Sequence, residues 1–410
     1  MAFAKRLAAL ALACALALAA CGAAVAGYRE RISAQPFMGY PSVDEVSNFD
    51  AMLRSYEARV DDGLDPILVF GSSELNPGPA GPAHPARLLE GGRYGVDVMV
   101  TGRAFCEDLW QAIEVGAFAE KLEQKRVVII PSMQWFMCYR TPARDFQAAY
   151  SEGAYRAFLE NDRISRATKD AVTARMRAYG VDRRGGSGGL SALGTQLDAH
   201  VSEARANVRL ALADDSGGDV RADGSAPSAP AHPHGAEEPD WQAIFREARL
   251  TAAERSSSND LGIYDGWYRK SYRGWLEKVR GWRVDDGEYF SQEELGDFKL
   301  LLQVCLEAGI EPLVLIQPVK GVLYDQTIYD RDVRAGYYQM MRDACTEAGV
   351  PCADFSSHEY DPLFLREYSH PSDLGGAYYS KAIYRYATEG VVDTDPAGDA
   401  AKSHVRGLTL

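Results

Sequence analysis

Three side chains in this sequence have the types and spacing of a nucleophilic catalytic site. Ser73 lies in FGSSEL (residues 70–75), directly after a short apolar run, where a tight turn can present its hydroxyl. Glu367 precedes His370 by three positions, so both side chains can face the same way on a turn. A serine nucleophile needs a base within hydrogen-bond reach, and that base needs a carboxylate that orients it. We therefore expect Ser73, His370 and Glu367 to form a site for acyl transfer or hydrolysis.

The other histidines are weaker candidates for the base. His232 and His234 lie in a low-complexity stretch, His404 lies in the C-terminal tail, and His200 falls in a polar helical segment. His84 and His358 stay as alternatives, but only His370 has a carboxylate three residues upstream. No cluster of His, Cys and acidic residues has metal-ligand spacing, and His232 with His234 lacks a third and fourth ligand. The sequence predicts neither a metal site nor a cofactor.

Short apolar runs alternate with segments of helical periodicity along most of the chain. This alternation predicts an α/β fold with a doubly wound parallel sheet and helices on both faces. Ligands of such sheets gather at the carboxyl ends of the strands, where Ser73 and Gly102 stand. We predict strands at residues 66–71, 96–101, 126–131, 312–317 and 350–355, and helices at residues 105–122, from the capping box at 291 to 309, 331–348 and 376–386.

Composition divides the chain into five segments. Residues 1–31 form a membrane anchor or signal peptide, residues 32–162 and 241–390 form two parts of one α/β catalytic domain, and residues 391–410 form a tail. Residues 163–240 are an insertion, polar and helical at first and then rich in Gly, Ser, Ala, Pro and Asp over 213–239, which predicts disorder there. Residues 241–289, rich in Trp and Tyr, are expected to form a helical cap over the sheet edge.

The N-terminal segment is apolar and uncharged over residues 7–26, which as a helix is long enough to span a bilayer core. We favour an uncleaved anchor, because the apolar stretch continues beyond Cys21 up to Arg29. LAACG (residues 18–22) also resembles a lipoprotein cleavage box, in which Cys21 would be acylated. Both interpretations place the body of the protein outside the membrane, although the flanking basic residues leave an inverted topology open.

Charge and cysteine content exclude some classes of protein. The 410 residues include 44 basic and 58 acidic side chains, for a formal net charge of -14, so nucleic-acid binding is not expected.

Seven cysteines occur, without CxxC spacing. In an exported protein Cys345 could pair with Cys352, or Cys106 with Cys138, and buried free thiols are the equally simple alternative.

The chain resembles the SGNH hydrolase superfamily and, more closely, the DltD family of D-alanyl transfer proteins. The resemblance covers most of the chain outside the insertion. It rests on an N-terminal anchor, FGSSEL (70–75), His84-Pro85, Gly102, IPSMQWF (130–136), LGIYD (261–265) and IQPVKGVLYD (316–325). This sequence departs from the family at two places. Glu367 stands where the family has an Asp, and PSDLGG (371–376) stands where the family has a Gly-Trp-rich run. Asp373 in that segment is therefore an alternative acid.

The resemblance implies roles for individual residues. Ser73 is the expected nucleophile, His370 the base, and the backbone N–H groups of Ser73 and Gly102 the oxyanion donors, with Gln134 in place of the Asn of other SGNH enzymes. Glu74, His84 and Trp135 are expected to bind substrate. Glu74 could pair with a D-alanyl ammonium, or could instead be an acidic residue favoured at a helix start.

Three functions follow from these residues and the resemblance. The first is transfer of D-alanine to hydroxyl groups of lipoteichoic acid outside the cell membrane, with a multispanning membrane O-acyltransferase and other D-alanylation proteins as partners. The second is an esterase or thioesterase that gives the acyl group to water. The third is a membrane-tethered scaffold without catalysis. Because the net charge repels a phosphate polymer, a polymer groove requires a local basic patch that the sequence does not locate.

Overall fold

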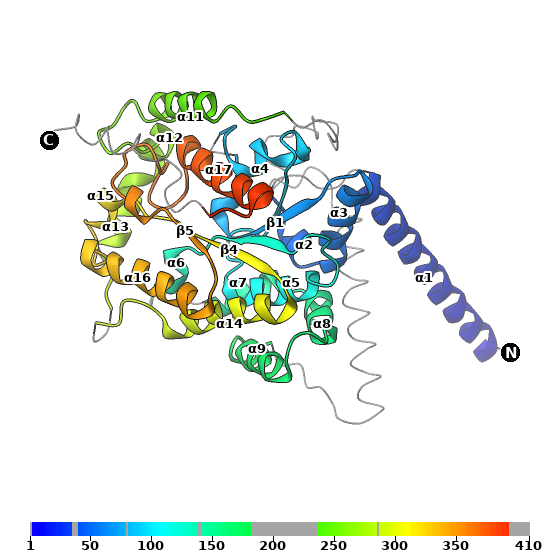
Figure 1. Cartoon of the computed structure of the whole chain (residues 1–410). Helices are drawn as coiled ribbons and strands as arrows, with labels where there is room; N and C mark the ends of the chain where they lie inside the picture. Colours follow the sequence, from blue (N-terminus) through cyan, green and yellow to red (C-terminus); the bar gives the residue numbers. More distant parts are fainter. Residues whose placement is uncertain are drawn as a thin grey trace.

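A parallel sheet of five strands forms the centre of the protein (Figure 1). The computed structural model describes residues 2–34, 40–78, 81–137, 142–181, 237–284 and 287–392. The strands are β1 (Pro66–Phe70), β2 (Asp97–Thr101), β3 (Arg126–Ile129), β4 (Glu311–Ile316) and β5 (Cys352–Asp354), in the order β2-β1-β3-β4-β5. All four pairings are parallel, so the predicted doubly wound α/β fold is confirmed.

The strand order places a topological switch point beside β1. The chain leaves β1 for β2 on one side and then crosses to β3 on the other side. The register pairs Phe70 with Thr101 of β2 and with Ile129 of β3, so the three carboxyl ends are level. Ligands of open α/β sheets bind at such a point, and the residue that follows β1 there is two positions before Ser73.

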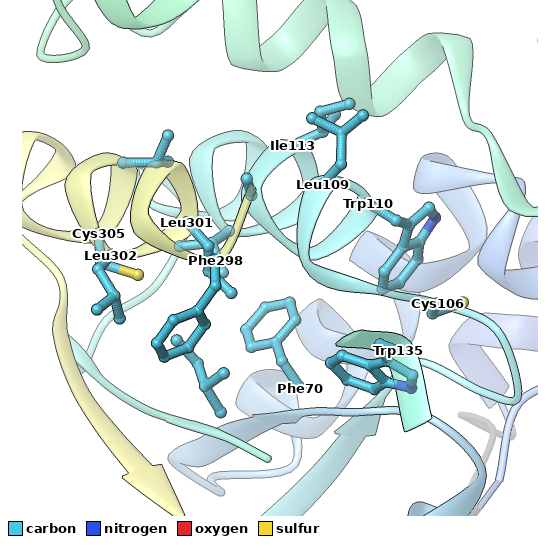
Figure 2. Packing of buried hydrophobic residues seen from close by; sticks show 14 of the residues in the cluster. Phe70, Cys106, Leu109, Trp110, Ile113, Trp135, Phe298, Leu301, Leu302 and Cys305 are labelled. Atoms are coloured by element: carbon cyan, nitrogen blue, oxygen red, sulfur yellow. The ribbon is translucent and has the colours of Figure 1, made fainter. Parts of the chain in front are cut away.

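Helices cover both faces of the sheet. In β1, Leu68 and Phe70 point into one apolar cluster and Ile67 and Val69 into the other, as the two-residue repeat of a strand requires. The helices are α1 (Ala2–Ala34), α2 (Val43–Val46), α3 (Phe49–Asp61), α4 (Pro85–Leu88), α5 (Asp108–Phe118), α6 (Met133–Phe136), α7 (Pro142–Ala149), α8 (Glu152–Glu160), α9 (Arg166–Ala178), α11 (Trp241–Arg255), α12 (Asp265–Trp267), α13 (Arg273–Val279), α14 (Gln292–Ala308), α15 (Gly321–Tyr324), α16 (Arg331–Ala348) and α17 (Asp373–Glu389). The first cluster includes residues of α3, α5, α14 and α16, and Figure 2 shows part of it around Phe70. The second includes residues of α4, α11 and α17.

Two of the four predicted helices have the expected ends; α5 ends at Phe118 and not at residue 122, and α17 ends at Glu389 and not at residue 386. α14 and α16 end at Gly309 and Gly349, both left-handed, as the sequence predicts. α17 begins at Asp373, before the predicted residue 376, because Ser372 caps it. α5 begins at Asp108, not Phe105: Phe105 has φ 75° and is 52% exposed, so it does not belong to the buried stripe.

The predicted capping box of α14 is only half formed. The Ser291 hydroxyl accepts from the backbone N–H of Glu294 at 3.2 Å, which is the first half. The Glu294 carboxylate does not return to Ser291; it accepts from the backbone N–H of Asp108 at 3.4 Å, and Ser291 N donates to Phe136 O. Tertiary contact with α5 has therefore replaced the local bond.

Segments outside the α/β core include α1 and the cap. Within α1, Lys5–Gly27 is long and apolar enough to cross a membrane, with mean hydropathy 2.3, a property that signal sequences share. In the predicted insertion, α9 is helical, but residues 182–236, with His200, His232 and His234, lie outside the described residues, as do residues 393–410 and Cys138. The predicted cap is helical: it comprises α11, α12, a π-helix (Tyr268–Tyr272) and α13, and α11 packs on α17 (Figure 1). The described cysteines are free thiols, Cys345 and Cys352 included.

Candidate active site

Ser73, His370 and Glu367 form a continuous hydrogen-bonded relay. His370 Nε2 lies 2.7 Å from Ser73 Oγ, and His370 Nδ1 lies 2.8 Å from Glu367 Oε1. Because an ionised carboxylate only accepts hydrogen bonds, Nδ1 carries the proton and Nε2 accepts from the serine hydroxyl. This is the tautomer that a general base beside a nucleophilic serine requires.

A tight loop between β5 and α17 holds the histidine and its carboxylate. Leu365 and Pro371 form an isolated antiparallel bridge, and the Arg366 N–H donates to His370 O at 3.0 Å, which closes the loop. Inside it, Glu367 Oε1 also accepts from the backbone N–H groups of Ser369 (3.0 Å) and His370 (2.7 Å). The carboxylate therefore orients the imidazole and braces the loop that carries it.

Glu367 is ionised in spite of its burial. Burial raises the pKa of this carboxyl, but the adjacent His370, its hydrogen bond and the charge of Arg366 outweigh that effect and lower the pKa to about 2. A buried anion next to the imidazole stabilises the imidazolium that forms when Ser73 loses its proton.

Asp373, the alternative acid, has other partners. Its Oδ1 accepts from the backbone N–H of Ala83 at 3.0 Å, and its own N–H donates to the Tyr264 hydroxyl at 2.9 Å. Its carboxylate thus ties the start of α17 to the loop before α4. The geometry favours Glu367 as the acid of the relay.

Ser73 opens a short 3-10 helix (Ser73–Leu75) after β1. The preceding Ser72 is buried: its N–H donates to Glu74 Oε1, and its hydroxyl accepts from the N–H of Phe105 at 3.0 Å. These bonds fix the turn from both sides, so the half-buried Ser73 is the serine directed to His370.

Gly102 and Gln134 flank the turn at the carboxyl ends of the neighbouring strands. Gly102 follows β2 with φ 129°, and a Cβ there would overlap the carbonyl oxygen of Gly71, so the position requires glycine. Gln134 lies in α6 after β3, with its amide 3.4 Å from the Tyr324 hydroxyl. The sheet order thus places Gly102 and Gln134, two of the three predicted oxyanion donors, on either side of β1; their role stays a prediction.

The three predicted substrate-binding residues lie in the interior. Glu74 and His84 are each 2% exposed and Trp135 is 4% exposed. Burial raises the pKa of Glu74 to about 7 and lowers the pKa of His84 to about 3. His84 Nε2 donates to Glu74 O at 2.9 Å and its Nδ1 accepts from Ala86 N at 3.2 Å, which satisfies both nitrogens of a neutral ring. These contacts support the turn of Ser73, and substrate binding by these side chains stays a prediction.

Lys320 is a site residue that the residue pattern did not single out. Its ammonium group is buried and donates to the carbonyls of Gly262 (3.0 Å), Pro362 and Leu365 (3.3 Å), while its N–H donates to Tyr368 O at 2.9 Å. Burial lowers its pKa to about 7. In the sequence, a lysine within an apolar stretch that follows a strand is the feature that indicates such a role, because a buried ammonium group needs buried hydrogen-bond acceptors.

A solvent-open groove of about 840 Å³ leads to His370. Its walls come from the cap and from the loop of Glu367 and His370. The charged side chains that line it are the basic Arg255, Arg269, Lys270 and Arg366 and the acidic Glu254, Asp265 and Glu367. Among the described residues, no group of three His, Cys, Asp or Glu side chains is placed to hold a metal ion.

Comparison with known proteins identifies the family. Residues 47–388 match the family model described as DltD protein. The chain is 27% identical over 334 residues to Protein DltD of Bacillus subtilis (strain 168), which covers 79% of this chain and 83% of the relative. It is 21% identical over 330 residues to Protein DltD of Staphylococcus aureus (strain NCTC 8325 / PS 47), covering 78% and 80% of the two chains. The match spans both parts of the α/β domain and the relay, and the chain therefore belongs to the DltD family.

Proposed function

We propose that this chain transfers D-alanyl groups, through an ester on Ser73, to hydroxyl groups of teichoic acid. Membership of the DltD family supports a role in teichoic acid D-alanylation. The observation that carries the catalytic part is the relay in which Ser73, His370 and Glu367 are joined by contacts of 2.7 and 2.8 Å.

The relay suits two successive acyl transfers. Ser73 Oγ attacks the carbonyl carbon of the activated D-alanyl donor, His370 Nε2 takes the hydroxyl proton, and the donor's leaving group departs with that proton. A polymer hydroxyl then attacks the acyl-serine ester, gives its proton to His370, and Ser73 leaves and recovers it. The oxyanion of each intermediate would be held by the N–H groups of Ser73 and Gly102 and by Gln134.

The proposed cellular setting combines a membrane anchor with an acceptor polymer outside the cell. With Lys5–Gly27 in the membrane, the α/β body would stand at the outer surface, where a multispanning membrane O-acyltransferase would deliver the D-alanyl group. Each new ester leaves an ammonium on the polymer, so the envelope becomes less anionic.

Hydrolysis is the second candidate function, favoured by one observation. His370 lines a groove that is open to solvent, so water can reach the base. Water would then replace the polymer hydroxyl in the second step and release free D-alanine.

The test uses a Bacillus subtilis strain without its own DltD, complemented with the full chain, and measures D-alanine ester on teichoic acid. We expect the chain to restore the ester, Ser73→Ala to abolish it, and the surface control Ser257→Ala to retain it. Full restoration by Ser73→Ala would refute the acyl-serine. Release of free D-alanine without polymer ester would establish hydrolysis instead.

A further inference from the structure

The cap presents a basic surface beside the relay, which we define as residues 267–280. This segment carries five basic side chains, Arg269, Lys270, Arg273, Lys278 and Arg280, and one acidic side chain, Glu277, in a chain whose formal net charge is -14. All five basic side chains are exposed, and within the described residues none lies in a salt bridge, although Arg269 interacts electrostatically with Asp265. Local charge of this sign in an acidic protein indicates an anionic partner.

The basic surface has an ordered arrangement. Arg269 and Arg273 are four residues apart, and Arg280 follows Arg273 by two helical turns, so the three guanidinium groups share one side of the segment. The π-helix (Tyr268–Tyr272) and α13 together span about 15 Å from Arg269 to Arg280. A row of this length can contact several successive charges of a linear polyanion.

Aromatic packing connects this surface to the catalytic histidine. Trp267 packs on Tyr368 with ring centroids 5.6 Å apart, and Tyr368 packs on His370 at 6.0 Å. Trp275 of α13 stacks on the same Tyr368 at 5.6 Å and 17°. Arg269 and Lys270 line the groove that contains His370. The row of cations therefore ends at the groove.

The lining of this groove also includes a buried cation. Arg366 is 7% exposed and lines the groove next to Glu367, with its guanidinium 3.4 Å from Pro371 O and 3.5 Å from Asn76 O. Asp265, four residues before Arg269 in the cap, accepts hydrogen bonds from Ser258 N and Asn259 Nδ2, each at 3.0 Å, and also interacts with the charge of Arg269. Glu254, Asp265 and Glu367 offset most of the positive charge of the groove lining, so the excess along the path from Arg280 to His370 comes from the basic surface itself.

We propose that the basic surface of residues 267–280 binds consecutive phosphodiester groups of the anionic acceptor polymer and leads a hydroxyl of that polymer to Ser73. This inference rests on the proposed function, because the groove serves an acceptor only if Ser73 carries the acyl group. Arginine suits this occupant, since its fork of N–H groups pairs with two phosphate oxygens. A membrane surface is the other polyanion, but α12 and α13 lie on the side of the body away from α1 (Figure 1).

The test measures binding of the full chain in detergent micelles to a fluorescently labelled glycerol-phosphate polymer freed of lipid and D-alanine. The variant is Arg269→Gln/Arg273→Gln/Arg280→Gln. Its matched control, Arg166→Gln/Lys169→Gln/Arg177→Gln, removes the same charge from α9, elsewhere on the body (Figure 1). We expect the cap variant to lose at least about 10-fold in polymer affinity at low salt, and the slope of its log affinity against log salt concentration to be smaller by roughly two. The affinity of the control should stay within about twofold of the parent chain.

Two results would overturn the inference. Equal losses of polymer affinity in the cap variant and the α9 control would show that only the total charge of the protein matters. Unchanged polymer binding, together with weaker binding of the cap variant to phosphatidylglycerol vesicles, would assign the surface to the membrane. Labelling of Ser73 by a fluorophosphonate is measured in the same samples. If Ser73 is labelled while polymer binding is unaffected, only this inference fails; if Ser73 is not labelled, the proposed function fails.

Discussion

Ser73 Oγ and His370 Nε2 lie 2.7 Å apart although 297 positions separate them in the sequence. The first residue belongs to the turn after β1, and the second belongs to the loop before α17. The two segments follow the carboxyl ends of the parallel strands β1 and β5, so they lie on the same side of the sheet, which explains how such distant residues meet.

Glu367, and not Asp373, is expected to support the histidine. Glu367→Gln keeps the size of the side chain but removes the charge that stabilises the imidazolium, so reaction of Ser73 with a fluorophosphonate should slow by roughly 10³- to 10⁴-fold. Asp373→Asn is the matched change. It should keep the labelling rate within about 10-fold of the parent's, because the Asp373 carboxylate accepts a hydrogen bond from Ala83 N and not from His370. The opposite order of the two rates would assign the role to Asp373.

Gly102→Ala is expected to destabilise the protein. The φ of 129° disfavours any side chain, and the new Cβ would overlap Gly71 O, so the free energy of unfolding should fall by more than about 2 kcal/mol in denaturant titrations. Gly296→Ala on α14 is the control: its Cβ meets nothing within 4 Å, and helix propensity predicts a gain of up to about 1 kcal/mol. Equal effects at both positions would contradict this account of the turn.

Much of the fold is predictable from the sequence, for a physical reason. Strands buried on both faces must be apolar throughout, and glycines that end helices mark the boundaries, as at Gly309 and Gly349. The apolar character of Phe105 predicts a place in a helical stripe, whereas in the structure its N–H donates to the Ser72 hydroxyl and the residue lies in a positive-φ turn. The spacing of apolar residues along the sequence carries no information about such a long-range hydrogen bond.

The candidate site was predictable only in part. The spacing of Glu367 and His370 in one tight loop is local, so the sequence shows it. The ammonium group of Lys320 binds three carbonyls that lie between 42 and 58 positions away, and a single sequence does not pair such groups. The burial of Glu74 likewise depends on the packing of the completed fold.

Glu74 makes stability depend on pH. Its pKa of about 7, raised from 4.5 by burial, means that the folded state holds a proton that the unfolded state loses between pH 4.5 and 7. Stability therefore falls as pH rises through this window. Glu74→Gln should remove that loss. The free energy of unfolding of the variant, relative to that of the parent, should therefore rise by up to roughly 3 kcal/mol from pH 4.5 to pH 8. Urea unfolding at both pH values measures this difference, and an equal difference at both would refute it.

Lys320 is expected to position the catalytic loop. Lys320→Met fills the space but leaves the carbonyls of Gly262, Pro362 and Leu365 without their donor, so unfolding free energy should fall by about 2–4 kcal/mol. The control Lys299→Met removes an exposed pair with Glu347, with an effect below about 1 kcal/mol. In folded Lys320→Met, slower labelling of Ser73 would show the loss of positioning, and unchanged labelling would assign Lys320 to stability alone.

Covalent labelling measures whether His370 activates Ser73. The full chain in detergent is treated with a fluorophosphonate, and intact mass and peptide mapping locate the adduct. The relay predicts one adduct on Ser73, lost in Ser73→Ala and strongly slowed in His370→Ala, with Ser72→Ala as the neighbouring control that keeps the adduct on Ser73. An adduct on Ser72, or equal labelling of Ser73 with and without His370, would contradict it.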